Sequence, residues 1–283
     1  MSGVGSTEPQ KSVGAGFAGA GAGKSAAAAV TMTGLTKIFA KGGTTALQEI
    51  DLELQPGEFV SLIGPSGCGK STLLRIIGDL VEPTRGTVLV GGKSAHQARL
   101  DRDYGMVFQE AVLYDWRTVA KNIALPLELA GWDRSRRTDR VKEMVELVEL
   151  AGFEGHHPWQ LSGGMQMRVA IARALSFDPK LLLMDEPFGA LDEMTRERLN
   201  LELLRIWEAS RSTVVFVTHS ITEAVFLSTR VVVMSPRPGR VAGVVEIDLP
   251  HPRTADTREE PRYFELATQL RELLRGRTAE AVH

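Results

Sequence analysis

One stretch of the sequence combines glycines, a lysine and hydroxyls in an order suited to binding phosphate. Residues 64–72 read Gly-Pro-Ser-Gly-Cys-Gly-Lys-Ser-Thr, which fits the phosphate-binding loop pattern of a glycine, four residues and Gly-Lys-Ser. The glycines allow the backbone to curl, so that its N–H groups point inward and form an anion nest. We expect Lys70 to reach the terminal phosphates of a nucleotide and Ser71 to offer its hydroxyl to Mg²⁺.

The segments on either side decide between this interpretation and a Gly-rich turn with a chance lysine. Residues 59–63, before the loop, are an apolar run of strand character, and residues 73–77 read as the start of a helix. Strand, loop and helix is the context that the motif needs. A helix beginning near Lys70 would also add the positive end of its dipole to the nest.

Two acidic residues follow another apolar run. Residues 181–186 read Leu-Leu-Leu-Met-Asp-Glu, and four consecutive apolar residues fit a strand buried on both faces of a parallel sheet. Open α/β sheets bind ligands at the carboxyl ends of such strands. We therefore expect Asp185 to hold Mg²⁺ through its water shell and Glu186 to contact an attacking water. His219 closely follows a further strand-like run, residues 213–217.

Three other features are ambiguous when each is taken alone. The segment 161–166, Leu-Ser-Gly-Gly-Met-Gln, can form a second anion nest at a helix start or simply cap an amphipathic helix. Phe39 ends the strand-like segment 31–38 and can stack on an adenine ring or serve as a core phenylalanine. Gln109 ends the short apolar run 104–108 and gains meaning only from the other motifs.

Composition narrows the class of protein. The chain has 283 residues, a formal net charge of −2, 43% hydrophobic residues and 24% charged residues, which is ordinary for a soluble globular protein of one large domain with at most a small appendage. The near-neutral charge gives no sign of a nucleic-acid surface. A single cysteine, Cys68, excludes internal disulfides and zinc clusters and fits a reducing cytoplasm. No apolar run approaches the roughly 18 residues of a membrane span.

The remaining patterns predict alternating strands and helices. Residues 31–38 and 47–54 read as two strands with a turn signal, Gly42-Gly43, between them. Further strands are expected at 87–90, 104–108, 230–234 and 241–247, and helices at about 118–130, 136–150, 193–210, 221–227 and 261–275. The apolar side of the last helix is expected to consist of Phe264, Leu266, Leu270, Leu273 and Leu274.

Together these motifs identify a family. The phosphate loop, Gln109, the segment 161–166, the strand ending in Asp185-Glu186, Asp192 and His219 occur in this order, and over residues 31 to about 235 they resemble the ATP-binding subunit of ABC transporters. The resemblance implies an α/β P-loop NTPase with a mainly parallel core sheet, an N-terminal antiparallel β subdomain and a helical subdomain that carries the signature motif 161–166.

The expected domain organisation follows from this resemblance and from composition. Residues 1–30 are rich in Gly, Ala and Ser and are expected to form a disordered tail, because they cannot bury enough surface to offset the entropy of ordering. The ATPase domain is expected at 31–248, with its helical subdomain at about 110–177. A short C-terminal helical extension is expected at 249–283.

A narrower resemblance is visible in two segments. Trp116-Arg117-Thr118-Val119 and the run 235–240, Ser-Pro-Arg-Pro-Gly-Arg, look like the nitrate/sulfonate/taurine importer group. Asp115 stands where that group usually has a proline, and Met167 where it usually has a glutamine. Neither is a catalytic position.

The family resemblance implies a mechanism shared between two subunits. They would pair head to tail, with ATP between the phosphate loop of one and the Ser162-Gly163-Gly164 nest of the other. The implied catalytic residues are Glu186, His219 and Gln109, and the implied Mg²⁺ ligands are Ser71, Gln109 and Asp185. The implied ATP-binding residues are Phe39, Gly64, Pro65, Ser66, Gly67, Cys68, Gly69, Lys70, Ser71, Thr72, Ser162, Gly163, Gly164, Gln166 and Asp192.

The same resemblance implies the partners and the location. We expect a homodimer of the ATPase subunit at the cytoplasmic face of the inner membrane, bound peripherally to integral membrane permease subunits. An extracytoplasmic solute-binding protein would deliver nitrate, a sulfonate, taurine or a related small solute. By analogy, residues from Gln109 to Trp116 would face the permease.

Three alternatives remain at this point. An ABC ATPase of DNA repair or translation usually carries coiled-coil insertions or two ATPase units in one chain, and this sequence has no heptads and one motif set. A phosphate-loop kinase acting on a small molecule would not need the segment 161–166. An exporter subunit is the third alternative, and the segments at Trp116 and Pro236 favour import over it.

Overall fold

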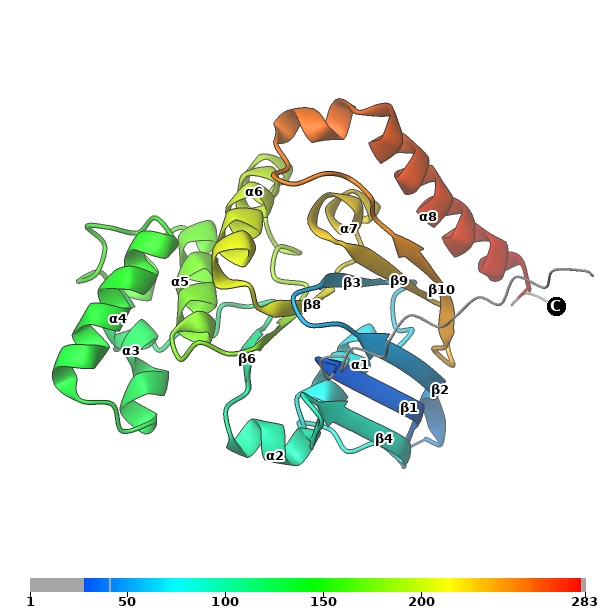
Figure 1. Cartoon of the computed structure of the whole chain (residues 1–283), viewed down its shortest axis with the longest axis horizontal. Coiled ribbons are helices and arrows are strands. Elements are labelled where there is room, and N and C mark those ends of the chain that lie inside the picture. The colour runs from blue at the N-terminus through cyan, green and yellow to red at the C-terminus, as the bar shows by residue number, and fades with distance from the viewer. Residues whose placement is uncertain (1–27, 41, 281–283) are drawn as a thin grey trace, which may run out of the picture.

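A computed structural model of the chain describes residues 28–40 and 42–280, and most of the predicted tail lies outside them. Within these residues the strands form two sheets (Figure 1). The larger has the order β10-β9-β3-β8-β7-β6, and the smaller has the order β2-β1-β4-β5. The prediction of an α/β fold with a mainly parallel core sheet and an antiparallel sheet near the N-terminus is therefore confirmed.

The core sheet brings the predicted motifs to one edge. Strands β3 (Phe59–Ile63), β8 (Thr213–Val217), β7 (Leu181–Asp185) and β6 (Tyr104–Val107) run parallel to one another. β3, β7 and β8 are buried along their whole length, as expected for a sheet covered on both faces. Their carboxyl ends share one edge, so the phosphate loop, Glu186, His219 and Gln109 all follow strands that end there. β9 (Arg230–Met234) is also parallel to β3, and β10 (Val241–Glu246) returns antiparallel to β9.

The small sheet covers one face of the phosphate-loop helix. β1 (Val30–Phe39) pairs antiparallel with β2 (Thr44–Leu54) and β4 (Arg85–Val90), and the short β5 (Lys93–Ser94) adds to β4. Helix α1 (Lys70–Ile77) buries Leu73, Leu74, Ile76 and Ile77 in a hydrophobic cluster shared by both sheets. The start of α1 is thereby fixed between two rigid layers.

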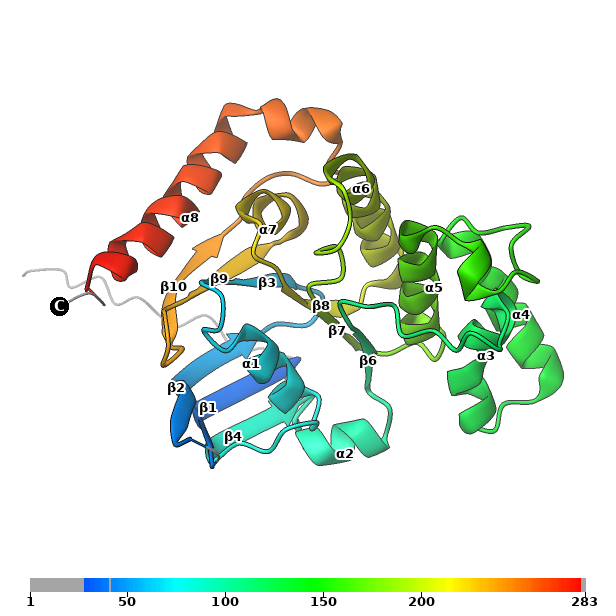
Figure 2. The same cartoon turned by 180° about the vertical axis from the view of Figure 1, so that it is seen from behind.

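Three helices form a separate group beside β6 (Figures 1 and 2). They are α3 (Val119–Leu129), α4 (Arg134–Leu147) and α5 (Gly163–Leu175), and α3 contacts both α4 and α5. A 3₁₀ turn at Pro158–Gln160 leads into α5, which begins in the signature segment. Ser162 caps this helix, since its side chain accepts a hydrogen bond from the backbone N–H of Met165.

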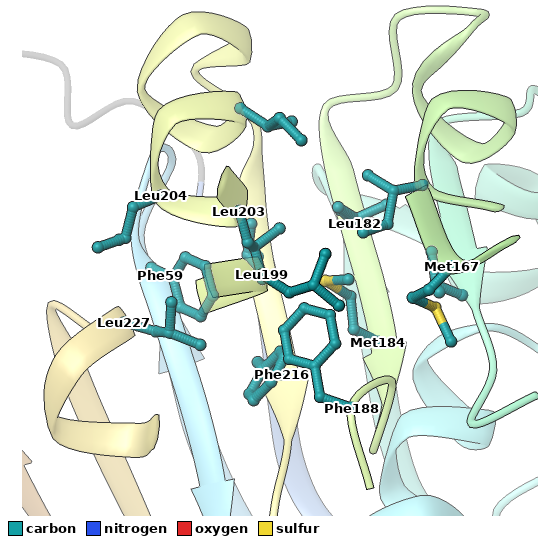
Figure 3. Packing of buried hydrophobic residues seen from close by; sticks show 14 of the residues in the cluster. Phe59, Met167, Leu182, Met184, Phe188, Leu199, Leu203, Leu204, Phe216 and Leu227 are labelled. Carbon is teal, nitrogen blue, oxygen red and sulfur yellow. The ribbon is translucent and has the colours of Figure 1, made fainter. Parts of the chain in front are cut away.

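A second hydrophobic cluster fills the opposite face of the core sheet (Figure 3). Phe59, Phe188 and Phe216 are fully buried there, and their rings contact one another in sequence, with centroids 5.8 Å apart for Phe59–Phe216 and 5.9 Å apart for Phe188–Phe216. Met167, the departure from the importer pattern, is buried in the same cluster. Phe188 lies two residues after Glu186, so this packing anchors the segment that carries Glu186.

Helices α6 (Glu193–Ser210), α7 (Ile221–Leu227) and α8 (Pro261–Glu280) cover this face (Figure 1). The apolar side of α8 differs from the prediction at one position. Leu266 and Leu270 are buried as expected, but Phe264 is exposed and Tyr263 is buried instead. Tyr263, Leu266, Ala267 and Leu270 follow the i, i+3, i+4, i+7 spacing of one helical face, and Phe264 lies beside that face.

Sequence reasoning did not anticipate α2 (Ala95–Leu100) or β5. Only Ala98 of α2 is buried, so the helix has no apolar pattern to detect. It is held by the Ser94 cap and by Lys93, whose Nζ lies 2.6 Å from Asp101 and 2.7 Å from Asp103. Among the described residues, no helix combines the length and apolarity that crossing a membrane requires.

Candidate nucleotide site

The phosphate loop lines a pocket of about 450 Å³ at the carboxyl edge of the core sheet. Eight predicted site residues line it: Phe39, Ser66, Gly67, Gly69, Lys70, Ser71, Thr72 and Glu186. Phe39 is half-exposed at the end of β1 and so presents an aromatic face to the pocket. That placement favours the stacking interpretation over a core phenylalanine.

The loop requires glycine where it approaches its neighbours. Gly69 has φ +108°, and a Cβ there would lie 2.7 Å from Leu47 Cδ2 and 2.9 Å from the Ala46 carbonyl oxygen. Any side chain would therefore be strained and would clash with β2. The Lys70 side chain is buried, and its Nζ donates to the carbonyl oxygens of Gly64 at 2.9 Å and Pro65 at 3.3 Å. The ammonium group is thus held within the curve of the loop.

A hydrogen bond between two side chains joins the loop to β7. Ser71 Oγ donates a 2.7 Å hydrogen bond to Asp185 Oδ1, and Arg75 Nη2 lies 3.8 Å from Asp185 Oδ2. Hydroxyl and carboxylate oxygens are the donors that Mg²⁺ prefers. The chemistry of this pair therefore fits the predicted metal position next to the terminal phosphates.

Glu186 and His219 face each other beyond this pair. His219 Nδ1 lies 3.4 Å from Glu186 Oε2. Glu186 has φ +48°, a left-handed conformation that non-glycine residues seldom adopt, and its N–H donates to the Val217 carbonyl oxygen at 3.0 Å. Strained backbone of this kind persists where the surroundings fix it, often at functional sites.

Gln109 approaches the same group from β6. A Cβ built on Gly189 would lie 3.5 Å from Gln109 Nε2 and 3.7 Å from Glu186 Oε2. The Gln109 amide and the Glu186 carboxylate therefore flank one glycine. The structure brings together the phosphate loop, Asp185, Glu186, His219 and Gln109, as the parallel strands predict.

The signature segment stands apart from the pocket. None of the described residues that line the pocket belongs to 161–166, and α5 lies in the helical group away from α1 (Figure 2). Ser162 and Gly163 are exposed at the start of α5. Gln166 Nε2 donates to the Pro158 carbonyl at 2.9 Å and the Leu161 carbonyl at 3.3 Å, so its amide holds the turn before the helix.

Asp192 has a structural role that the motif alone does not reveal. Its Oδ1 accepts the Thr195 N–H at 3.0 Å and so caps α6. This backbone hydrogen bond is the main reason that the pKa of Asp192 lies below its ordinary value. Cys68 is also structural in character: it is 1% exposed, and burial raises the pKa of its thiol.

Arg237 is a site residue that sequence reasoning did not single out. It lines the pocket, and its Nε and Nη2 donate to the Gly67 carbonyl oxygen at 3.2 and 3.0 Å. The adjacent turn is pressed against the loop, since a Cβ on Gly239 would overlap the Cys68 carbonyl oxygen. The run 235–240 was noted in the sequence for its resemblance to the importer group. Its contact with the phosphate loop could not be predicted, because 170 residues separate Arg237 from Gly67 and only the fold brings them together.

The family model described as ABC transporter matches residues 47–189. The chain belongs to this family. The chain is 48% identical over 227 residues to an aliphatic sulfonates import ATP-binding protein of Bacillus cereus, covering 80% of this chain and 88% of that protein. It is 42% identical over 257 residues to a nitrate import ATP-binding protein of Synechocystis, covering 88% of this chain and 96% of that protein.

A solved structure supports the same assignment. A dimeric ATP-binding cassette in a post-hydrolysis state, bound to ADP and Pi, shares 37% sequence identity with this chain at a TM-score of 0.67. The match covers 77% of this chain and 98% of the cassette. The protein is therefore an ATPase of the ABC family.

Proposed function

We propose that two copies of this chain hydrolyse ATP at a shared interface and thereby drive solute uptake through a membrane permease. The observation that carries the proposal is the separation of the two anion nests: the pocket contains the phosphate loop, but the exposed Ser162 and Gly163 lie outside it. A second copy placed head to tail would bring its Ser162-Gly163-Gly164 nest to the terminal phosphate. The dimeric cassette bound to ADP and Pi supports this arrangement.

ATP binding would favour the closed pair, and loss of the γ-phosphate would release it. Shifting a two-state equilibrium from 1:99 to 99:1 needs about 5.5 kcal/mol of differential binding. Two triphosphates, each touching both subunits, would supply that energy. Residues 31–248 would form this ATPase domain.

Each residue of the site would have a separate role in ATP binding or hydrolysis. Phe39 would stack on adenine, while Lys70 and the loop amides bind the β- and γ-phosphates. Ser71, Asp185 and Gln109 would hold Mg²⁺, which would neutralise charge on the phosphates when bound. Glu186 would polarise the attacking water, and His219, 3.4 Å from it, would steady the γ-phosphate. A positioned base of this kind contributes about 10² to 10⁴ in rate.

An exposed aromatic surface fits the expected permease contact. Trp116 is 72% exposed and Trp159 is 65% exposed. Tyr114 packs on Trp116 with ring centroids 4.9 Å apart, and His157 stacks on Trp159 at 4.3 Å. His157 Nδ1 also donates to the Asp115 carbonyl oxygen at 3.1 Å, so the loop after Gln109 and the loop before the signature form one surface.

A neighbouring pocket strengthens this interpretation. It has a volume of about 470 Å³, lies between β6 and the helical group, and is lined largely by apolar residues. These include Met106, Val112, Leu113, Leu125, Leu129 and Phe177. Large exposed apolar patches mark protein contacts, and a short helix of the permease would fit here. The relatives named for sulfonate and nitrate import favour a small anionic solute.

The dependence of hydrolysis on protein concentration tests the shared site. At concentrations where the monomer predominates, we expect a hydrolysis rate that is second order in protein. A rate first order throughout, together with transfer of phosphate to a small molecule, would instead support the kinase alternative. For the solute, the chain would be reconstituted in liposomes with its permease and solute-binding protein, and nitrate, taurine and alkanesulfonates compared for stimulation of hydrolysis.

A further inference from the structure

The C-terminal segment, residues 249–276, lies over the helix that follows His219. After β10 the chain crosses back over α7, and α8 then runs outside α7 and along β10 (Figure 1). α8 contacts α7, β9 and β10. Leu249, Tyr263, Leu266 and Leu270 are buried in one cluster with the apolar residues of α7. The helix next to the catalytic edge is thus enclosed by a segment that takes no part in the pocket.

A buried arginine of the segment hydrogen-bonds to the C-terminal end of α7. Arg253 is 5% exposed, and its Nη1 donates to the carbonyl oxygens of Val225 at 3.2 Å and Phe226 at 2.8 Å. Carbonyls in the last turn of a helix lack partners within the helix, and a cation there complements the helix dipole. Burial lowers the pKa of Arg253 to about 10, so the guanidinium remains charged at neutral pH.

The segment also contacts the first turn of α7. Tyr263 is 4% exposed, and its hydroxyl donates to the Thr222 carbonyl oxygen at 3.0 Å. Thr222 is three residues from His219. One side chain of the segment therefore holds each end of this short helix.

The loop that bears His219 is in turn tied to α7. Ser220 caps the helix by accepting the Glu223 N–H at 3.3 Å, and the Thr218 hydroxyl donates to the Glu223 carboxylate. A displacement of α7 would therefore move Thr218, His219 and Ser220 together. Since His219 lies 3.4 Å from Glu186, a shift of about 1 Å is enough to disturb their geometry.

A third contact links the segment to α6. Arg258 lies over the Phe226 ring at 4.3 Å, and its Nη1 pairs with Glu197 of α6 at 2.6 Å. α6 begins at the Asp192 cap, a few residues after Glu186. The segment thus bridges the two helices that follow the catalytic strands β7 and β8.

We propose that the C-terminal segment positions His219 for hydrolysis, with Tyr263 as the positioning residue that acts through α7. The inference rests on the proposed role of His219. Tyr263 is not among the residues that line the phosphate-loop pocket. Its hydroxyl holds the first turn of α7 in place through the Thr222 carbonyl oxygen. The position of this turn would set how close His219 comes to the γ-phosphate.

Tyr263→Phe tests this directly, because it removes one hydroxyl and keeps the buried ring. The expected result is a fall in kcat of about 3- to 10-fold, within what a modest misplacement of a catalytic group produces, while KM for ATP stays within about twofold. The same substitution in a His219→Ala background, measured under single-turnover conditions, is expected to cause no further loss. Leu273→Ala is the matched control, because Leu273 packs near Gly243 of β10 and its loss should lower the melting temperature without changing kcat.

The outcomes separate the inference from the proposed function. An equal fold-loss in both backgrounds, or an unchanged kcat for Tyr263→Phe, overturns the inference. If His219→Ala alone keeps the parental rate, the proposed role of His219 fails first. If His219→Ala is slow but Tyr263→Phe is normal, the inference alone fails.

Discussion

The hydroxyl of Ser71 donates a 2.7 Å hydrogen bond to the carboxylate of Asp185, 114 residues further along the chain. This contact joins the phosphate loop after β3 to the end of β7, two strands separated in the sheet by β8. Asp185 is almost fully buried. Because little solvent screens its carboxylate, it would attract a cation bound beside Ser71 strongly. The proposed metal position is beside this pair.

Asp185→Asn should weaken the response to Mg²⁺ more than the binding of ATP itself. The amide keeps an oxygen for the Ser71 hydroxyl but removes the negative charge. Outer-shell substitutions at metal sites commonly reduce metal affinity or activity by about 10- to 100-fold. A Mg²⁺ titration of ATP hydrolysis should show a shift of that size, and an unchanged Mg²⁺ midpoint would argue against Asp185 as a metal-site residue.

Arg237→Gln should raise KM for ATP with little change in kcat. The guanidinium lines the pocket while it braces the Gly67 carbonyl, and the charge is partly screened by solvent. An exposed charge of this kind contributes up to about 1 kcal/mol, so the expected rise in KM is about 2- to 5-fold.

Arg240→Gln is the matched control for Arg237→Gln. Arg240 is three residues further along the chain and carries the same charge, but its side chain does not line the pocket. Steady-state measurements of KM and kcat for ATP on both variants test whether the effect is specific to Arg237. Equal effects of the two substitutions would show that Arg237 acts only through the net charge of the turn.

The Cys68 thiol should react slowly at neutral pH. Burial raises its pKa above the ordinary value of 9.0, so the reactive thiolate is scarce and its fraction rises about tenfold per pH unit until the pKa is passed. The rate of modification by a maleimide should follow this slope beyond pH 9.0, and Mg-ATP should slow it. Modified protein should lose ATPase activity because the adduct fills the loop.

Cys68→Ala tests whether inhibition by the maleimide comes from the bulk of the adduct or from loss of a thiol that hydrolysis needs. We expect it to retain ATP hydrolysis, because the thiol serves as a small buried side chain. A plateau in the modification rate below pH 8, modification without inhibition, or an inactive Cys68→Ala protein would contradict this account.

Much of the fold follows from the sequence because its central strands are buried on both faces. Runs such as 181–184 and 213–217 contain no polar alternation, which identifies them as inner strands of a parallel sheet. Once these strands are parallel, the groups that follow them must share one edge. This is why Asp185, Glu186 and His219 could be grouped before any geometry was known.

The features that sequence did not reveal depend on contacts across long separations. Arg237 meets Gly67 only because β9 lies next to β3. The choice of Tyr263 over Phe264 as the buried aromatic residue depends on a partner for the hydroxyl, which the Thr222 carbonyl provides. Helix α2, with little apolar surface, is specified by its ion pairs and cap rather than by periodicity.

Sedimentation velocity on Glu186→Gln protein with Mg-ATP tests the shared site most directly, with Glu186→Gln/Gly163→Asp as the comparison. Gly163 is exposed in the first turn of α5, where an acidic side chain suits the helix dipole, but its charge would repel a phosphate presented by a second copy. We expect a dimer for Glu186→Gln and a monomer that still binds ATP for the double variant. Dimers of equal stability for both, or an ATP-loaded Glu186→Gln monomer, would contradict it.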